Sequence, residues 1–96
     1  MNQEIIDAIE KKKLIEFIYD GESRVVEPHC YGLSTKGNEV LRAYQVDGYS
    51  SSGNMGWKMY DLGKANSINV LDDTFDESRN GYNRRDKAMS EIYSEL

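Results

Sequence analysis

The residues that most resemble a reactive group are the chain's only proline, histidine and cysteine, which are consecutive at Pro28, His29 and Cys30. A thiol beside an imidazole can act as an activated nucleophile. The triplet lies in an expected β-strand, however, where successive side chains point to opposite faces, so we expect His29 and Cys30 to be unable to act together on one substrate atom. We expect Cys30 to be a small buried apolar residue, and Pro28 to mark a strand edge or bend. We expect His29 to be a surface or hydrogen-bonding residue that could still contact a ligand.

No other arrangement of residues points to catalysis. One cysteine and one histidine cannot complete a disulfide or a zinc site, and the sequence has no P-loop, GxSxG or HExxH motif. The acidic pairs Asp72-Asp73 and Asp76-Glu77 follow the last expected strand, where a solvated loop is the default interpretation. We therefore expect no enzymatic activity, no cofactor and no metal.

Charge is distributed unevenly along the 96 residues, whose net charge is −5. Residues 1–20 carry five acids against three lysines, residues 65–96 carry seven acids against four bases, and residues 21–64 carry five of each. Because phosphate binding depends mainly on Lys and Arg, this distribution disfavours a broad face for duplex nucleic acid and allows a local basic pocket. No apolar run approaches the roughly 20 residues that span a bilayer, and the N-terminus lacks a signal-peptide apolar block. The sequence thus predicts a cytoplasmic protein with no membrane partner.

A second group of residues combines cations with aromatic rings. Arg42 and Tyr44 share one face of an expected strand, and Lys58 follows a serine- and glycine-rich loop beside Trp57, which we expect in the core. Such neighbours can hold phosphates and stack bases, as in proteins that bind nucleotides or single strands. The alternative is that the seven tyrosines only cover the fold. Arg42 is the residue we most expect to contact a ligand.

These residues must be positioned by a mainly β (α+β) fold. The apolar stripe of Ile5, Ile6 and Ile9 predicts a helix over about residues 3–12, capped by Asn2. The alternating runs around Asp20-Gly21 predict a hairpin with a type I′ turn. With three further strand candidates, they predict a small Sm/SH3-like antiparallel barrel of about five strands.

The C-terminal part is expected to be helical. After a cap at Asn83, apolar residues follow a helical stripe at Ala88, Met89, Ile92 and Leu96. Residues 1–75 would then form the barrel with its N-terminal helix. Residues 76–96 would form a loop and a helix packed on the same domain.

In their order along the chain, these features resemble the WYL domain family over roughly residues 5–75. The most specific part is the hairpin pattern F-x-Y-x-G … R-x-V-x-P, seen here at Phe17, Tyr19, Gly21, Arg24, Val26 and Pro28. Of the tripeptide that names the family, only the leucine of Glu39-Val40-Leu41 is present. The family's strand pattern R-t-F-r-l-d-R falls on residues 58–64, with Lys58 and Lys64 in place of two arginines and Asp61 in place of a third. Lysine keeps the charge but loses the bidentate fork of arginine.

The resemblance implies a Sm-type SH3-like barrel that binds a nucleic-acid or nucleotide-like ligand in a basic and aromatic groove. In the family such domains usually serve as sensor modules of bacterial transcription regulators. The resemblance therefore implies a non-catalytic module with a regulatory or sensing role, which binds a short single-stranded oligonucleotide or a nucleotide-type signal. The expected ligand-binding residues are Arg42, Tyr44, Lys58, Lys64, Tyr19, Arg24 and His29.

Two alternatives remain open at the level of the sequence. The first is a protein-interaction or assembly module, which would form a homo-oligomer or bind a protein partner through strand edges. The second is a phage-encoded sponge, which would sequester a host nucleotide signal through the same ligand chemistry.

Overall fold

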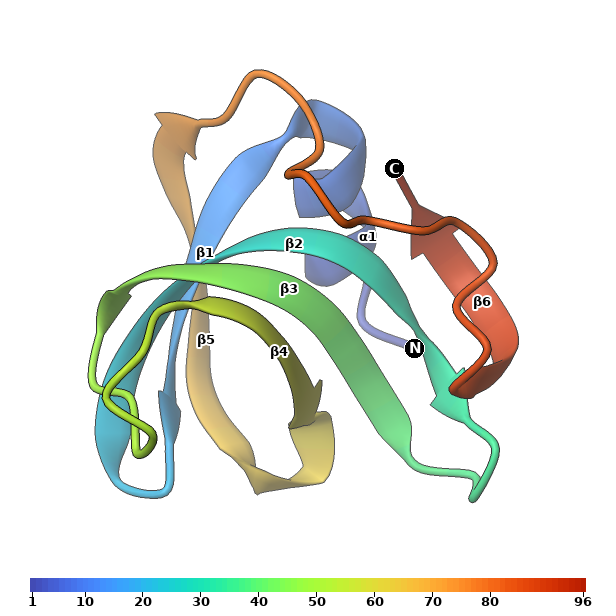
Figure 1. The fold of residues 1–96 in the computed structure, drawn as a ribbon, viewed down its shortest axis with the longest axis horizontal. Helices are drawn as coiled ribbons and strands as arrows, with labels where there is room; N and C mark the ends of the chain where they lie inside the picture. Colours follow the sequence, from blue (N-terminus) through green and yellow to red (C-terminus); the bar gives the residue numbers. More distant parts are fainter.

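The computed structural model describes all 96 residues, which form one antiparallel sheet and one α-helix. Along the chain the elements are α1 (Gln3–Lys11), β1 (Lys13–Tyr19), β2 (Glu22–Ser34), β3 (Glu39–Gly48), β4 (Gly56–Asp61), the 3-10 helix η1 (Leu62–Lys64), β5 (Ala65–Thr74) and β6 (Met89–Glu95). The strand order is β4-β3-β2-β1-β5, and β6 also pairs with β2 (Figure 1). The mainly β class expected from the sequence is confirmed.

The first helix and the first hairpin form as the sequence predicts. The Asn2 side chain accepts hydrogen bonds from the amides of Glu4 and Ile5, and the left-handed conformation of Lys12 ends α1. In the turn between β1 and β2, Asp20 and Gly21 have φ angles of 52° and 77°. Two consecutive positive φ angles are what a type I′ turn requires, so the strands leave the turn with the twist of the sheet.

Strand β2 organises the rest of the sheet because it is long enough to pair with three strands. Its first half pairs with β1, its second half with β6, and its other edge with β3. The register with β3 shifts between Pro28, which is opposite Ala43, and Cys30, which is opposite Arg42. His29 is therefore an extra residue in a β-bulge, next to a proline that has no N–H for the ladder.

The bulge corrects one expectation from the sequence. Cys30 is opposite Arg42, and the His29 ring lies 4.7 Å from the ring of Trp57, which itself pairs with Tyr44 of the same face. His29 and Cys30 therefore lie on the same face of the sheet, and the expected alternation between them is wrong. A bulge interrupts the alternation of side chains, which a sequence pattern of period two does not reveal.

The two faces of the sheet are covered by different parts of the chain. On one face, α1 contributes Ile5, Ile6, Ala8 and Ile9 to a core with side chains such as Phe17 and Leu41. The other face carries His29, Cys30, Tyr44 and Trp57. It is covered by residues 75–88, here named the strap, which run from the end of β5 to β6 (Figure 1). The strap and β6 thus pack on the same domain as residues 1–74.

Two finer expectations about the fold are wrong. Strand β4 pairs only with β3 and β5 only with β1, so the sheet is not closed into a barrel. The C-terminal segment forms β6 and not a second helix, because the second half of β2 has an edge that β1 does not reach. Register shifts within the β2–β6 pairing let Met89 and Ile92, three residues apart, pack against the same cluster. Their helical spacing therefore occurs in an irregular strand.

The only α-helix is nine residues long. No helix of the protein has the length and apolar character that crossing a membrane requires.

The pairing of β6 with β2 can be tested at Gly32. A Cβ atom at this position would collide with the Glu91 carbonyl oxygen of β6 and lie 2.9 Å from the Ile92 Cα. We expect Gly32→Ala to lower the free energy of unfolding by about 2 kcal/mol, since overpacking against backbone cannot be relieved by a side-chain rotation. Urea denaturation measures this change, and hydrogen exchange shows whether the β6 amides lose protection.

Gly63→Ala is the matched control, because the nearest atom to a Cβ there is a side-chain oxygen of Asp61 at 3.3 Å. Equal stability losses in the two variants would contradict the close contact between β2 and β6.

Candidate functional site

A hollow of about 680 Å³ lies between the sheet and the strap and is here named the basic pocket. Strand β3 contributes Arg42 and β4 contributes Trp57, and the remaining walls are residues 81–87 of the strap. Its charged lining residues are four cations and one carboxylate, namely Arg42, Arg84, Arg85, Lys87 and Asp86. The lining is therefore net positive, although the chain as a whole carries a net charge of −5.

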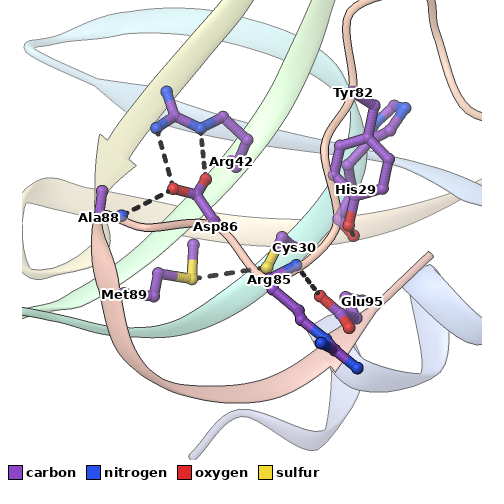
Figure 2. A network of polar contacts seen from close by, with 9 residues as sticks. All are labelled: His29, Cys30, Arg42, Tyr82, Arg85, Asp86, Ala88, Met89 and Glu95. Atoms are coloured by element: carbon purple, nitrogen blue, oxygen red, sulfur yellow. Dashed lines mark hydrogen bonds and ion pairs between the residues drawn. The ribbon is translucent and has the colours of Figure 1, made fainter.

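Arg42 forms the floor of the pocket and is paired with Asp86. Its Nε lies 2.8 Å from Asp86 Oδ2, and the Ala88 amide donates to Asp86 Oδ1 at 2.9 Å (Figure 2). Burial raises the pKa of Asp86, but the hydrogen bonds from Arg42 and Ala88 outweigh it and hold that pKa below its usual value. Asp86 therefore stays ionised at neutral pH and fixes the end of the strap to β3.

The three other cations of the pocket differ in how strongly they are held. The Arg84 guanidinium lies 3.0 Å from Glu95 and donates to the Leu96 carbonyl oxygen at 2.8 Å. The Arg85 backbone amide also donates to Glu95, but the Arg85 and Lys87 side chains form no ion pair. These two exposed cations are thus available to a ligand without breaking an internal contact.

The aromatic wall of the pocket is a stack of Trp57 on Tyr82. Their ring centroids are 5.9 Å apart at an interplanar angle of 20°, and Trp57 Nε1 donates to the Asn80 carbonyl oxygen at 2.9 Å. The strap approaches closely at Gly81, where φ is +89° and a Cβ atom would lie 3.2 Å from Trp57 Nε1. A glycine at this position lets the strap close on the indole. Trp57 is half-buried and lines the pocket as well as packing beneath the strap.

Behind this wall, His29 is fully buried and uses both ring nitrogens. Nδ1 lies 2.8 Å from the Glu27 carbonyl oxygen, and Nε2 accepts the Arg79 amide hydrogen at 3.1 Å. A carbonyl only accepts and an amide only donates, so these partners require a neutral ring with its proton on Nδ1. Burial lowers the pKa of His29, although the Glu27 carbonyl and carboxylate oppose this and raise it. His29 is the hydrogen-bonding residue that the sequence allowed, and it is not a surface residue.

Arg79 fastens the strap beside His29. Its guanidinium makes two hydrogen bonds to the buried Glu27 carboxylate, at 2.7 and 3.0 Å, and lies 4.5 Å over the Tyr44 ring. A bidentate pair of this kind fixes the orientation of both side chains. The strap itself therefore covers Tyr44, which we expected to be open to a ligand.

Cys30 is a packing residue, as its sequence context predicts. It is fully buried, and its Sγ lies 3.5 Å from the Met89 sulfur (Figure 2). Burial raises the pKa of the Cys30 thiol to about 11, with the carboxylates of Glu95 and Asp86 acting in the same direction. Although Cys30 and His29 share a face, no hydrogen bond joins them, so they do not form a nucleophile and base pair.

The seven expected ligand-binding residues do not form one groove. Arg42, Tyr44 and His29 lie together on the strap side, and of these only Arg42 lines the basic pocket. The Lys58 Nζ is held by the loop between β3 and β4, through Ser50, Ser52 and the Asn54 carbonyl. Lys64 is exposed in η1.

The remaining two expected residues, Tyr19 and Arg24, lie on the other face, where Tyr19 is partly buried against the core. Arg24 is 4% exposed, donates to the Tyr19 carbonyl oxygen at 3.2 Å, and its guanidinium lies 5.5 Å from the Tyr19 ring and 5.4 Å from the Tyr49 ring. This guanidinium forms no ion pair and lines none of the pockets of the protein. The positive charge of Arg24 is covered by rings and is not presented to a ligand.

The sequence did not lead us to the three cations of the strap, Arg84, Arg85 and Lys87. The sequence pattern predicts the start of a helix over this run, after a cap at Asn83. The available signal was local charge, because residues 84–87 carry three of the four bases of the acidic C-terminal third. Strap cations and Arg42 are distant in sequence and meet only through the β2–β6 pairing.

The state of the Cys30 thiol can be tested by its reactivity. A shift of the pKa to about 11 implies roughly 100-fold less thiolate than an unperturbed cysteine has at pH 8, and burial also blocks access. We therefore expect a disulfide reagent to modify the native protein at least about 100-fold more slowly than the urea-unfolded chain. Equal rates in the two states would show a reactive thiol and contradict this structure of the bulge.

Comparisons with protein-family models, with curated proteins and with solved structures give no match for this chain.

Proposed function

We propose that the protein is a non-catalytic module that binds a phosphate-bearing, nucleotide-type ligand in the basic pocket. The observation that carries the proposal is the convergence of four cations beside the Trp57–Tyr82 stack, in a chain whose overall charge is −5. Cations attract and orient phosphate oxygens, and an aromatic ring gives a base a flat apolar surface. A pocket of about 680 Å³ lies within the range of small-molecule sites.

The cations have distinct roles in this proposal. The exposed side chains of Arg85 and Lys87 provide the first contacts with phosphate, since neither has an internal partner. Arg42 is the cation nearest the sheet, and Asp86 already occupies its carboxylate-binding edge. A ligand phosphate would have to share or replace that carboxylate, which favours ligands carrying more than one negative charge.

The resemblance to WYL domains supports the same class of ligand, and we propose kinship with that family. Its support is the hairpin pattern at Phe17, Tyr19, Gly21, Arg24, Val26 and Pro28 in the sequence. The proposed site differs from the groove inferred by resemblance, because it uses the strap cations and leaves out Lys58, Lys64, Tyr19 and Arg24. We also propose a sensing or regulatory role, because a protein that binds a ligand without converting it can act only by being bound or free.

Ligand binding can be tested through Trp57, the only tryptophan. Titration with hexathymidylate, ADP and pyrophosphate should change the Trp57 fluorescence for the probes that bind, with affinity falling as salt rises. We expect the double variant Arg85→Gln, Lys87→Gln to weaken binding about tenfold or more, because it removes the two unpaired cations.

The double variant Lys11→Gln, Lys36→Gln is the matched control. It changes the net charge equally at exposed positions outside the basic pocket. Equal weakening by both double variants would show that only long-range charge matters. Failure of all three probes to bind the unmodified protein would contradict the proposed function.

The free strand edges support self-association as a second candidate function. Strand β4 pairs only with β3 and β5 only with β1, so each leaves one edge unpaired. Unpaired edges can add a strand from a second copy or from another protein. If this is the function, native mass spectrometry should show a dimer that grows with protein concentration. A monomer throughout the micromolar range would contradict self-association and leave ligand binding as the function.

A further inference from the structure

We propose that His29 is a proton-controlled latch, which holds the strap closed when neutral and releases it when protonated. Opening of the strap at His29 would displace the Tyr82 wall of the basic pocket, so acidification would weaken ligand binding. The latch itself stands on the contacts of His29, and only its effect on ligand rests on the proposed function.

The closed strap requires the neutral ring. In that state Nε2 accepts the Arg79 amide hydrogen and the Nδ1 proton points to the Glu27 carbonyl oxygen. A proton on Nε2 would turn this acceptor into a donor that faces the N–H of Arg79. It would also place a positive charge on a side chain that is fully buried. Both changes favour the open strap, since a buried polar group without a partner and a buried charge are unfavourable.

The groups around the ring compensate such a charge only in part. Phe75 stacks on it with centroids 5.6 Å apart, and Trp57 and Tyr82 contact it edge-on at 4.7 and 5.0 Å. The ionisable neighbours are Glu27 and Cys30 on β2 and Arg79 and Tyr82 on the strap. The Glu27 carboxylate, which is paired with Arg79, favours protonation of the ring, and the Arg79 charge opposes it. The thiol and phenol are neutral, and burial is the largest effect and keeps the pKa of His29 low.

Residues 79–82 of the strap are attached around His29, whereas residues 84–88 are held separately by the Arg42–Asp86 and Arg84–Glu95 ion pairs. Within residues 79–82, the Arg79 amide binds the ring, Asn80 accepts from Trp57, and the Tyr82 hydroxyl donates to the His29 carbonyl oxygen at 3.2 Å. Residues 76–81 are otherwise exposed. Loss of the hydrogen bond between the Arg79 amide and His29 therefore weakens the attachment of residues 79–82 to the sheet.

Opening at His29 reaches the basic pocket through Gly81 and Tyr82, which line the pocket and directly follow Arg79 and Asn80. A ligand that packs against Tyr82 therefore binds the closed strap better than the open one. By linkage, a bound ligand must then lower the proton affinity of His29, and protonation of His29 must lower the affinity for the ligand by the same factor.

The direction of the pH dependence follows from the states of His29. Its pKa in the closed strap is lower than the ordinary 6.5, so closure is fully favoured above pH 6.5 and is lost as the pH falls toward the lowered value. Asp86 remains ionised in this interval because its pKa is held below its usual value, so it does not share the transition.

Hydrogen exchange of the Arg79 amide measures the latch directly, because this amide is the one bonded to His29 Nε2. Measured by NMR without ligand from pH 8 to pH 5, and corrected for intrinsic exchange, its protection should fall by up to about tenfold per pH unit below pH 6.5. His29 is the only histidine, so its imidazole resonances report its protonation in the same samples. The fall in protection should coincide with the protonation of His29.

Two variants separate the latch from other titrations. In His29→Gln the side-chain carbonyl can still accept the Arg79 amide but cannot be protonated, so protection should be independent of pH in this interval. In Glu27→Gln the pH dependence should remain, at lower overall protection. Constant protection of the unmodified protein while His29 becomes protonated, or equal pH dependence in His29→Gln, would overturn the proposal, and the first result requires no variant to fold.

The same measurement with added ligand distinguishes failure of the latch from failure of the proposed function. Saturating hexathymidylate should shift the opening of the strap to lower pH. If the strap opens with His29 but the oligonucleotide neither binds nor shifts the transition, the proposed ligand chemistry is wrong and the latch stands. If the oligonucleotide binds with the same affinity at pH 5 and pH 8, the coupling between latch and pocket is wrong.

Discussion

The hydrogen bond from the Arg79 amide to His29 Nε2 is the contact on which the strap side of the molecule depends. It exists because β2 bulges after Pro28 and turns His29 to the same face as Cys30 and Arg42. The buried ring then offers an acceptor to the strap, and the Glu27–Arg79 pair closes beside it. Without that attachment, residues 79–82 would cover Trp57 and Tyr44 less closely, while Asp86 and Arg84 would still hold the end of the strap.

Acidic and basic side chains gather in different parts of the molecule, which the net charge of the chain does not reveal. The acids of α1 and β5 lie on elements that do not line the basic pocket, where four cations gather around one carboxylate. Two of these cations are fixed by ion pairs with Asp86 and Glu95, and two remain unpaired. A site of this kind can bind an anion while the protein as a whole repels it, which favours ligands small enough to be held within the pocket.

The parts of the fold that depend on neighbouring residues could be predicted from the sequence. The cap at Asn2, the left-handed pair Asp20-Gly21 and the burial of Cys30 all follow from local chemistry. The parts that depend on distant residues could not. Strand β6 forms because β2 has an unpaired edge, which leaves no signature in residues 89–95 themselves. Pro28 indicates a bend in β2, but the face to which His29 turns depends on the register with β3.

The same division explains the candidate site. Arg42 was identified because a cation beside Tyr44 on one strand is a local pattern, whereas Arg85 and Lys87 reach it only through the path of the strap. Tyr19 and Arg24 were misplaced because the pattern did not show which face α1 would cover.

The most direct test of this account is the tautomer of His29, which long-range proton–nitrogen NMR spectra report for a single histidine at neutral pH. We expect one neutral form, with the proton on Nδ1 and none on Nε2, because the Glu27 carbonyl and the Arg79 amide allow no other. A ring protonated on Nε2, or one averaging between both tautomers as in free imidazole, would contradict it.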